Sequence, residues 1–204
     1  MSKHTLLLAS KIGDVIGKFS FVFPKAPDRL KIVCIPTAAN VYEDKPWLEE
    51  EKQPFRNMGF NLSDFDIENK SAWEVEGKLT DADVVYITGG NTYYLLEKMK
   101  ACGFEKAIRK CLDEGAIYVG SSAGAIVAGP SIDFIRDMDD PTKARLDDFA
   151  GLNLIDFKIL PHIDHPKYGP KAQAIAAEIK SAERVLGLRD NQAVLISGGY
   201  IEIY

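Results

Sequence analysis

Short runs of apolar and β-branched residues recur along the chain, and they constrain its fold more than any other feature. Such runs are typical of buried strands, and they lie at residues 6–9, 31–36, 84–88, 116–120, 194–197 and 200–204. Between 88 and 116 the apolar residues recur at helical spacing instead, in one stripe at Tyr93, Leu96 and Met99 and another at Phe104, Ala107, Ile108, Cys111 and Leu112. Strands that alternate with helices predict parallel pairing through right-handed crossovers. We therefore expect an α/β fold, a three-layer sandwich with a mostly parallel central sheet flanked by helices.

The C-terminal end differs from this pattern. Only Gly198 and Gly199 separate the last two apolar runs, which is typical of a β-hairpin and makes the sheet mixed. A further helix is expected near 171–182, and the polar, acidic segment 133–149 is expected to be an exposed loop region. The 204 residues fit one compact domain, so we expect residues 1–204 to form a single domain.

Composition and charge argue against some classes of partner and indicate a cellular compartment. The formal charge is −5, from 25 basic and 30 acidic residues, which argues against a nucleic-acid partner. The chain has three cysteines, and no two of them form a C-x-x-C pair. Neither a disulfide framework nor a zinc site is therefore expected. The apolar run Thr5 to Ala9 is too short for a signal peptide or a membrane span. We expect a cytoplasmic protein with no membrane partner.

One motif carries candidate chemistry. Residues 120–124, Gly-Ser-Ser-Ala-Gly, match G-x-S-x-G directly after an expected strand and directly before Ala125-Ile126-Val127-Ala128. In this context the central serine, Ser122, lies on a sharp strand-to-helix turn that exposes its hydroxyl. The glycines on either side remove side chains that would collide with neighbouring chain. Ser121 is the competing nucleophile, but only Ser122 has glycine two residues away on both sides. A tightly packed turn of small residues is the alternative interpretation.

A serine nucleophile needs a base, and the chain offers three histidines, His4, His162 and His165. His4 precedes the first strand, near the terminus, where order is lowest. The other two follow a short apolar run, the position where α/β folds collect site residues, so the base is His162 or His165. The pair flanks Asp164 and resembles a metal cluster, but no third ligand stands nearby at helical spacing. We expect no metal.

A second loop follows the strand at 84–88. Gly89-Gly90-Asn91-Thr92 opens the next helix and exposes backbone amides, with Asn91 or Thr92 as its N-cap. The chain has neither G-x-G-x-x-G nor Gly-Lys-Ser/Thr, so both nucleotide fingerprints are absent and no cofactor is expected. An oxyanion or substrate-backbone role fits this loop better.

Taken together, these motifs occur in the order seen in the aspartyl dipeptidase (peptidase E) family, which also includes cyanophycinase. The residues that carry the resemblance are Ile35-Pro36-Thr37-Ala38, Ile87 to Thr92, Gly120 to Ala125, Ala128-Gly129-Pro130 and Pro161-His162. The resemblance spans nearly the whole chain. It implies a fold like the class I glutamine amidotransferase domain, with serine in place of the elbow cysteine, and serine-type peptide hydrolysis.

The resemblance also implies roles for individual residues. It makes Ser122 the nucleophile and His162 the base, with oxyanion amides at Gly90 and Ala123, and Gly89 and Asn91 as neighbouring substrate-binding residues. For the triad acid, the residues themselves leave open Asp133, Asp137, Asp139, Asp140, Asp147 and Asp148, and the family pattern points to Asp137.

Two departures from the dipeptidase bear on the substrate. Ser121 stands where the dipeptidase has tryptophan, and Lys171 stands where it has arginine. If Lys171 binds an acidic group of the substrate, its ammonium cannot form the two parallel hydrogen bonds that arginine forms with a carboxylate. We therefore expect a modest preference for acidic N-terminal residues and not strict aspartyl specificity.

Two functions follow from these observations. The first is a serine peptidase that acts on short peptides through an acyl-enzyme at Ser122 and needs no cofactor. The second is a non-catalytic protein of the same fold that holds a small ligand in the crevice at 89–91, because fold alone does not determine function.

Overall fold

The structure is a computed structural model, and it describes residues 4–179 and 183–204. Its strands are β1 (Thr5–Ala9), β2 (Ile32–Ile35), β3 (Leu62–Asp64), β4 (Val84–Ile87), β5 (Ile117–Ser121), β6 (Lys158–Leu160), β7 (Val185–Gly187), β8 (Ala193–Ser197) and β9 (Tyr200–Ile203). Its α-helices are α1 (Ile12–Val15), α2 (Pro46–Asn57), α3 (Ala72–Leu79), α4 (Thr92–Ala101), α5 (Phe104–Asp113), α6 (Ala123–Ile126) and α7 (Gly169–Glu178). Short 3₁₀ turns include η3 (Thr37–Ala39), η4 (Asp133–Ile135) and η5 (Pro141–Lys143).

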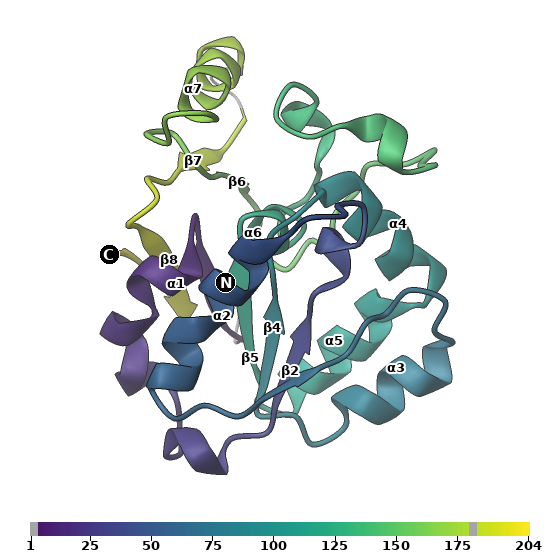
Figure 1. Ribbon diagram of the computed structural model, residues 1–204, viewed down its shortest axis with the longest axis vertical. Coiled ribbons are helices and arrows are strands. Elements are labelled where there is room, and N and C mark those ends of the chain that lie inside the picture. The colour runs from purple at the N-terminus through teal and green to yellow at the C-terminus, as the bar shows by residue number, and fades with distance from the viewer. Residues whose placement is uncertain (1–3, 180–182) are drawn as a thin grey trace.

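Seven strands form the main sheet, in the order β3-β2-β4-β5-β1-β8-β9. The pairs from β3 to β1 are parallel, and β8 and β9 are antiparallel to their neighbours. Gly198 and Gly199 both have positive φ, 57° and 87°, as the two-residue hairpin turn requires. The predicted mixed α/β sheet with a C-terminal hairpin is therefore confirmed (Figure 1).

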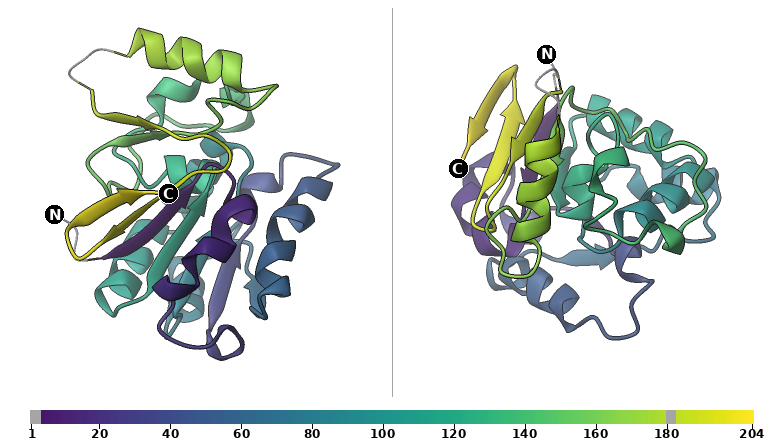
Figure 2. Two further views of the ribbon diagram at one scale, coloured as in Figure 1. Left: turned by 90° about the vertical axis from the view of Figure 1, so that its left-hand side faces the viewer. Right: turned by 90° about the horizontal axis from the view of Figure 1, so that it is seen from above.

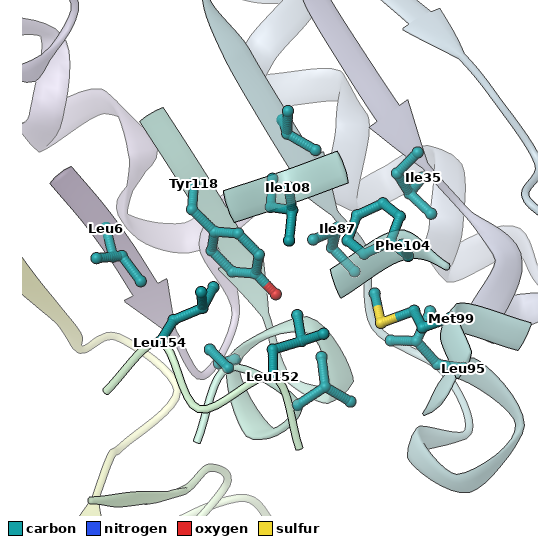
Figure 3. Packing of buried hydrophobic residues seen from close by; sticks show 14 of the residues in the cluster. Leu6, Ile35, Ile87, Leu95, Met99, Phe104, Ile108, Tyr118, Leu152 and Leu154 are labelled. Atoms are coloured by element: carbon teal, nitrogen blue, oxygen red, sulfur yellow. The ribbon is translucent and has the colours of Figure 1, made fainter. Parts of the chain in front are cut away.

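The two faces of the sheet are buried under different helices. Alternate residues of β1 point to opposite sides, so that Leu6 and Leu8 pack with α3, α4 and α5 while Leu7 and Ala9 pack with α1 and α2. Figure 3 shows the first of these clusters, with Tyr118 of β5 near its centre. The Tyr118 hydroxyl donates a hydrogen bond to the Gly124 carbonyl at 2.7 Å, which ties this core to the start of α6.

The sequence patterns did not reveal every helix and strand. The helices α1, α2 and α3 and the short strands β3, β6 and β7 were not predicted, whereas α4 and α5 were. The predicted helix at 171–182 begins earlier, at Gly169, because Pro170 occupies its first turn. It ends at Glu178, and residues 180–182 of that prediction lie outside the described residues. The segment 133–149 contains η4 and η5 and is otherwise irregular.

A second, two-stranded sheet positions part of the site. The strands β6 and β7 pair in parallel, with Ile159 opposite Leu186. Figures 1 and 2 show this pair and α7 beyond the end of the main sheet at which α6 begins. We call residues 158–190 of this region, as far as the structure describes them, the β6–β7 arm. Within the described ranges, no helix has the length and hydropathy that a bilayer span requires.

Candidate active site

Ser122 lies on the turn between β5 and α6. Its backbone has φ 48° and ψ −108°, a conformation that is uncommon and strained for a residue with a side chain. The flanking glycines are sterically required, because a Cβ at Gly120 would lie 2.5 Å from the Gly124 oxygen and one at Gly124 would lie 2.3 Å from the Ile87 oxygen. The turn therefore has the strained backbone and the close chain contacts that the G-x-S-x-G motif predicts.

His162 meets Ser122 from the β6–β7 arm. Its Nε2 lies 2.9 Å from Ser122 Oγ, and its Nδ1 lies 2.6 Å from Asp190 Oδ1. A carboxylate can only accept, so Nδ1 carries the proton, and Nε2 is free to accept from the serine hydroxyl. His162 follows β6 and Asp190 follows β7, so the parallel pairing of these two strands brings base and carboxylate together.

Ser10 connects this arm to the main sheet. It is fully buried directly after β1. Its hydroxyl donates to Asp190 Oδ1 at 2.9 Å, accepts the His162 backbone N–H at 2.8 Å and lies 3.2 Å from His162 Nδ1. Sequence analysis missed this residue, and its only signal is a position immediately after a buried strand.

The electrostatics of the site favour a neutral imidazole. Burial lowers the pKa of His162 below its ordinary value, while the hydrogen bond and the charge of Asp190 act in the opposite direction. A neutral imidazole is the form that can take a proton from a hydroxyl.

The Gly89-Gly90 loop faces the same serine. Gly90 has φ 138°, and a Cβ there would lie 2.3 Å from the Ala38 carbonyl group, so only glycine fits this approach to η3. Asn91 caps α4, accepting the Tyr94 N–H at 2.9 Å and donating to the Asp140 carbonyl at 3.0 Å. Within the described residues, the amides of Gly90 and Ala123 donate to no backbone carbonyl. Ala123 follows Ser122 directly in the chain, and Gly90 lines the same cavity as Ser122.

A cavity of about 610 Å³ opens at Ser122 and His162. Gly89 and Gly90 line it, but Asn91 and Lys171 are not among its lining residues. Lys171 is exposed on α7, because the first turn of this helix points its side chain to solvent. The charged groups that line the cavity, besides the histidines, are Lys11, Asp14, Asp44, Glu50, Glu51, Asp139 and Lys167.

The resemblance points to Asp137 as the triad acid, but the structure does not bring Asp137 to His162. Asp137 is exposed after η4, and within the described chain no hydrogen bond joins it to His162. Its neighbours Met138 and Asp139 line the cavity instead, and Asp139 accepts the Thr92 N–H at 2.8 Å. Asp190 occupies the place that the resemblance assigned to Asp137. The apolar run at 185–188, followed by an acid, is a signal that could have found it.

The other two histidines have different surroundings. His165 lines the cavity, and its Nδ1 accepts the backbone N–H groups of Lys167 and Tyr168 at 3.0 and 3.3 Å. His4 directly precedes β1, and its Nε2 is 3.0 Å from Asp113 Oδ1. Among residues 4–179 and 183–204, no group of three or more His, Cys, Asp or Glu side chains could hold a metal ion.

The family model and the relatives of known sequence point to the same family. The model of peptidase family S51 matches residues 17–204. An uncharacterized peptidase of Listeria monocytogenes is 33% identical over 194 residues, covering 95% of this chain and 94% of its own length. Peptidase E of Shewanella amazonensis is 31% identical over 162 residues, covering 77% of this chain and 65% of its own length.

A solved structure agrees with the sequence relatives. The crystal structure of a protein described as a peptidase E, from Listeria monocytogenes, covers 98% of both chains with a TM-score of 0.91 and 31% identity. The resemblance to peptidase E and the prediction of a serine-type peptidase are confirmed. The chain therefore belongs to peptidase family S51.

Proposed function

We propose that Ser122, His162 and Asp190 are the catalytic triad of this serine peptidase. The observation that carries the proposal is the continuous hydrogen-bonded chain from Ser122 Oγ to His162 Nε2 and from His162 Nδ1 to Asp190 Oδ1, at 2.9 and 2.6 Å. Serine, imidazole and carboxylate in this order are recognised as a triad by geometry and not by sequence position.

The reaction then proceeds through an acyl-enzyme. Ser122 Oγ attacks the peptide carbonyl carbon while His162 Nε2 takes the hydroxyl proton, and the backbone N–H groups of Gly90 and Ala123 hold the oxyanion. His162 then gives the proton to the departing amine as the C–N bond breaks. Water, deprotonated by the same nitrogen, releases the acyl group and restores Ser122.

Short peptides are the substrates that this site supports. The cavity volume of about 610 Å³ lies in the range of small-molecule pockets, and two relatives are described as peptidase E. An acidic side chain could approach Lys167 or His165, which line the cavity, whereas Lys171 lies outside it. A preference for acidic residues therefore depends on Lys167 and His165 and is expected to be modest.

A cytoplasmic location is also part of the proposal. Cys34, Cys102 and Cys111 are buried and free, which suits a reducing compartment.

Labelling with a small fluorophosphonate, followed by a panel of dipeptides, tests the proposal. The wild type should be labelled at Ser122 and should hydrolyse dipeptides, and Ser122→Ala should do neither. Ser121→Ala is the matched control, which should keep the labelling and should lose far less turnover than Ser122→Ala. A wild type that binds dipeptides without labelling or turnover would support the ligand-binding alternative and contradict the triad.

A further inference from the structure

Glu51 places a carboxylate beside the reacting hydroxyl. The side chain reaches from α2 to the cavity, where its Oε1 accepts the Tyr86 hydroxyl at 2.7 Å. The other oxygen faces the Gly89 loop: a Cβ at Gly89 would lie 3.6 Å from Glu51 Oε2 and 3.9 Å from Ser122 Oγ. The carboxylate and the serine hydroxyl therefore both lie within 4 Å of the same point beside this loop, and both residues line the cavity.

This carboxylate has no cationic partner. Within the described residues, no lysine, arginine or histidine lies within ion-pair distance of Glu51. The adjacent Lys52 turns away, toward Asp64 at 2.8 Å and Glu49 at 3.4 Å. Burial raises the pKa of Glu51, while hydrogen bonds from Ser121, Tyr86 and the Gly89 backbone oppose that rise. The groups that hydrogen-bond to this carboxylate are neutral, and the charge of Lys52 lowers its pKa only from beyond ion-pair distance, so its charge is costly to bury without a close counter-ion.

The other acidic groups of the cavity are engaged or more distant from the serine. Asp14 forms an ion pair with Lys11 at 3.0 Å, and Asp139 accepts a backbone N–H at the start of α4. Glu50 is exposed. Among the described residues that line the cavity, Glu51 is half-buried, forms no ion pair and borders the Gly89 loop beside Ser122.

We propose that Glu51 binds the α-ammonium group of the substrate, so that the site selects peptides with a free N-terminus at the residue that is cleaved. The inference rests on the proposed catalytic role of Ser122. The attacked carbonyl carbon must lie about 3–3.5 Å from Ser122 Oγ, and the α-nitrogen is two bonds from that carbon. The ammonium therefore lies within a few ångströms of Ser122, the region that Glu51 Oε2 borders.

The small side chain at position 121 fits this arrangement. Ser121 accepts the Ile12 N–H at 3.2 Å and hydrogen-bonds to the Glu51 carboxylate. Ser121 thus helps to orient the Glu51 carboxylate.

The test uses Glu51→Gln and a substrate pair that differs only in the ammonium, alanyl p-nitroanilide and propionyl p-nitroanilide. A charged hydrogen bond of this kind predicts a 10- to 100-fold loss of kcat/KM for the alanyl substrate. The propionyl substrate and the rate of fluorophosphonate labelling should change less than about threefold. Glu49→Gln removes the same charge from the same helix outside the cavity and should leave both substrates unaffected.

Three results would overturn the inference. If Glu51→Gln lowers kcat/KM for both substrates and the labelling rate by the same factor, Glu51 only supports the Gly89 loop. If the ratio of kcat/KM for the alanyl and propionyl substrates is unchanged in Glu51→Gln, the ammonium binds elsewhere. Glu51→Asp keeps the charge with a shorter stem, so it should retain part of the preference and serves as a second variant if Glu51→Gln folds poorly. A wild type that labels with fluorophosphonate but does not discriminate also contradicts the inference, whereas a wild type that does not label contradicts the triad itself.

Discussion

The two halves of the proposed catalytic site are held in different ways. The nucleophile half, residues 120–124, is continuous in sequence and sits between β5 in the centre of the main sheet and α6. The base half lies on the β6–β7 arm, where His162 and Asp190 are 28 residues apart and meet through two three-residue strands. Steric necessity determines the first half, and long-range pairing determines the second. The nucleophile half is therefore the easier of the two to predict from the sequence.

The largest effect is expected at the nucleophile half. Ser122→Ala should lower kcat/KM for dipeptides by about 10⁴-fold or more, and His162→Ala should lower it by a similar factor. The double variant should be scarcely worse, because nucleophile and base act as one unit. Steady-state kinetics of the three variants measure this, and additive losses would mean that the two halves do not share a proton-transfer step.

Ser10 provides a test of how the halves are coupled. Ser10→Ala removes the hydroxyl that holds the His162 backbone and Asp190 against β1. We expect a loss of about 10- to 100-fold in kcat/KM, because the base loses its orientation but stays present. Ser197→Ala changes a serine at the far end of the neighbouring β8 and should have little effect. An unaffected Ser10→Ala enzyme would show that the arm positions His162 without the main sheet.

The pH profile of kcat/KM tests whether burial lowers the pKa of His162. His162 is active when neutral, and burial lowers its pKa below the ordinary value of about 6.5. The acid limb of kcat/KM should therefore have its midpoint below pH 6.5, and activity should fall as the pH drops through that midpoint. A midpoint above about 7 would mean that Asp190 outweighs burial.

The smallest effect is expected at the rim of the arm. Lys171→Met should leave the ratio of kcat/KM for Asp-Ala and Ala-Ala unchanged, because Lys171 is exposed and outside the cavity lining. Lys167→Met should lower that ratio by a few-fold, since one point charge at a solvent-exposed rim contributes little. A larger change for Lys171→Met would assign specificity to α7.

Much of the fold and half of the site could be predicted from local patterns. The strands β1, β2, β4, β5 and β8 are short apolar runs whose residues are buried on the two faces of the sheet. The strand β9 was found by the same pattern, but it is an exposed edge strand and not a buried one. The elbow was readable because five consecutive residues carry its steric requirements. The histidine pair was readable because the chain has only three histidines.

The remainder depends on contacts that no local pattern records. The buried stripe of α2 is Leu48, Lys52 and Phe55, and the lysine, neutralised by Asp64, interrupts the apolar spacing that would reveal a helix. Glu51 could not be assigned to the site because its helix was not predicted. Asp190 was missed because β7 is three residues long and half exposed, so its pairing with β6 shows only in three dimensions.

The most direct test of the triad compares Asp190→Asn with Asp137→Asn. Both substitutions keep shape and remove a charge, and thermal unfolding verifies that both variants fold. The geometry predicts that Asp190→Asn lowers kcat/KM for dipeptides by about 10³- to 10⁴-fold, as expected when the carboxylate that sets the histidine tautomer is lost, whereas Asp137→Asn stays within about threefold of wild type. The reverse order, with Asp137→Asn inactive and Asp190→Asn active, would contradict the account.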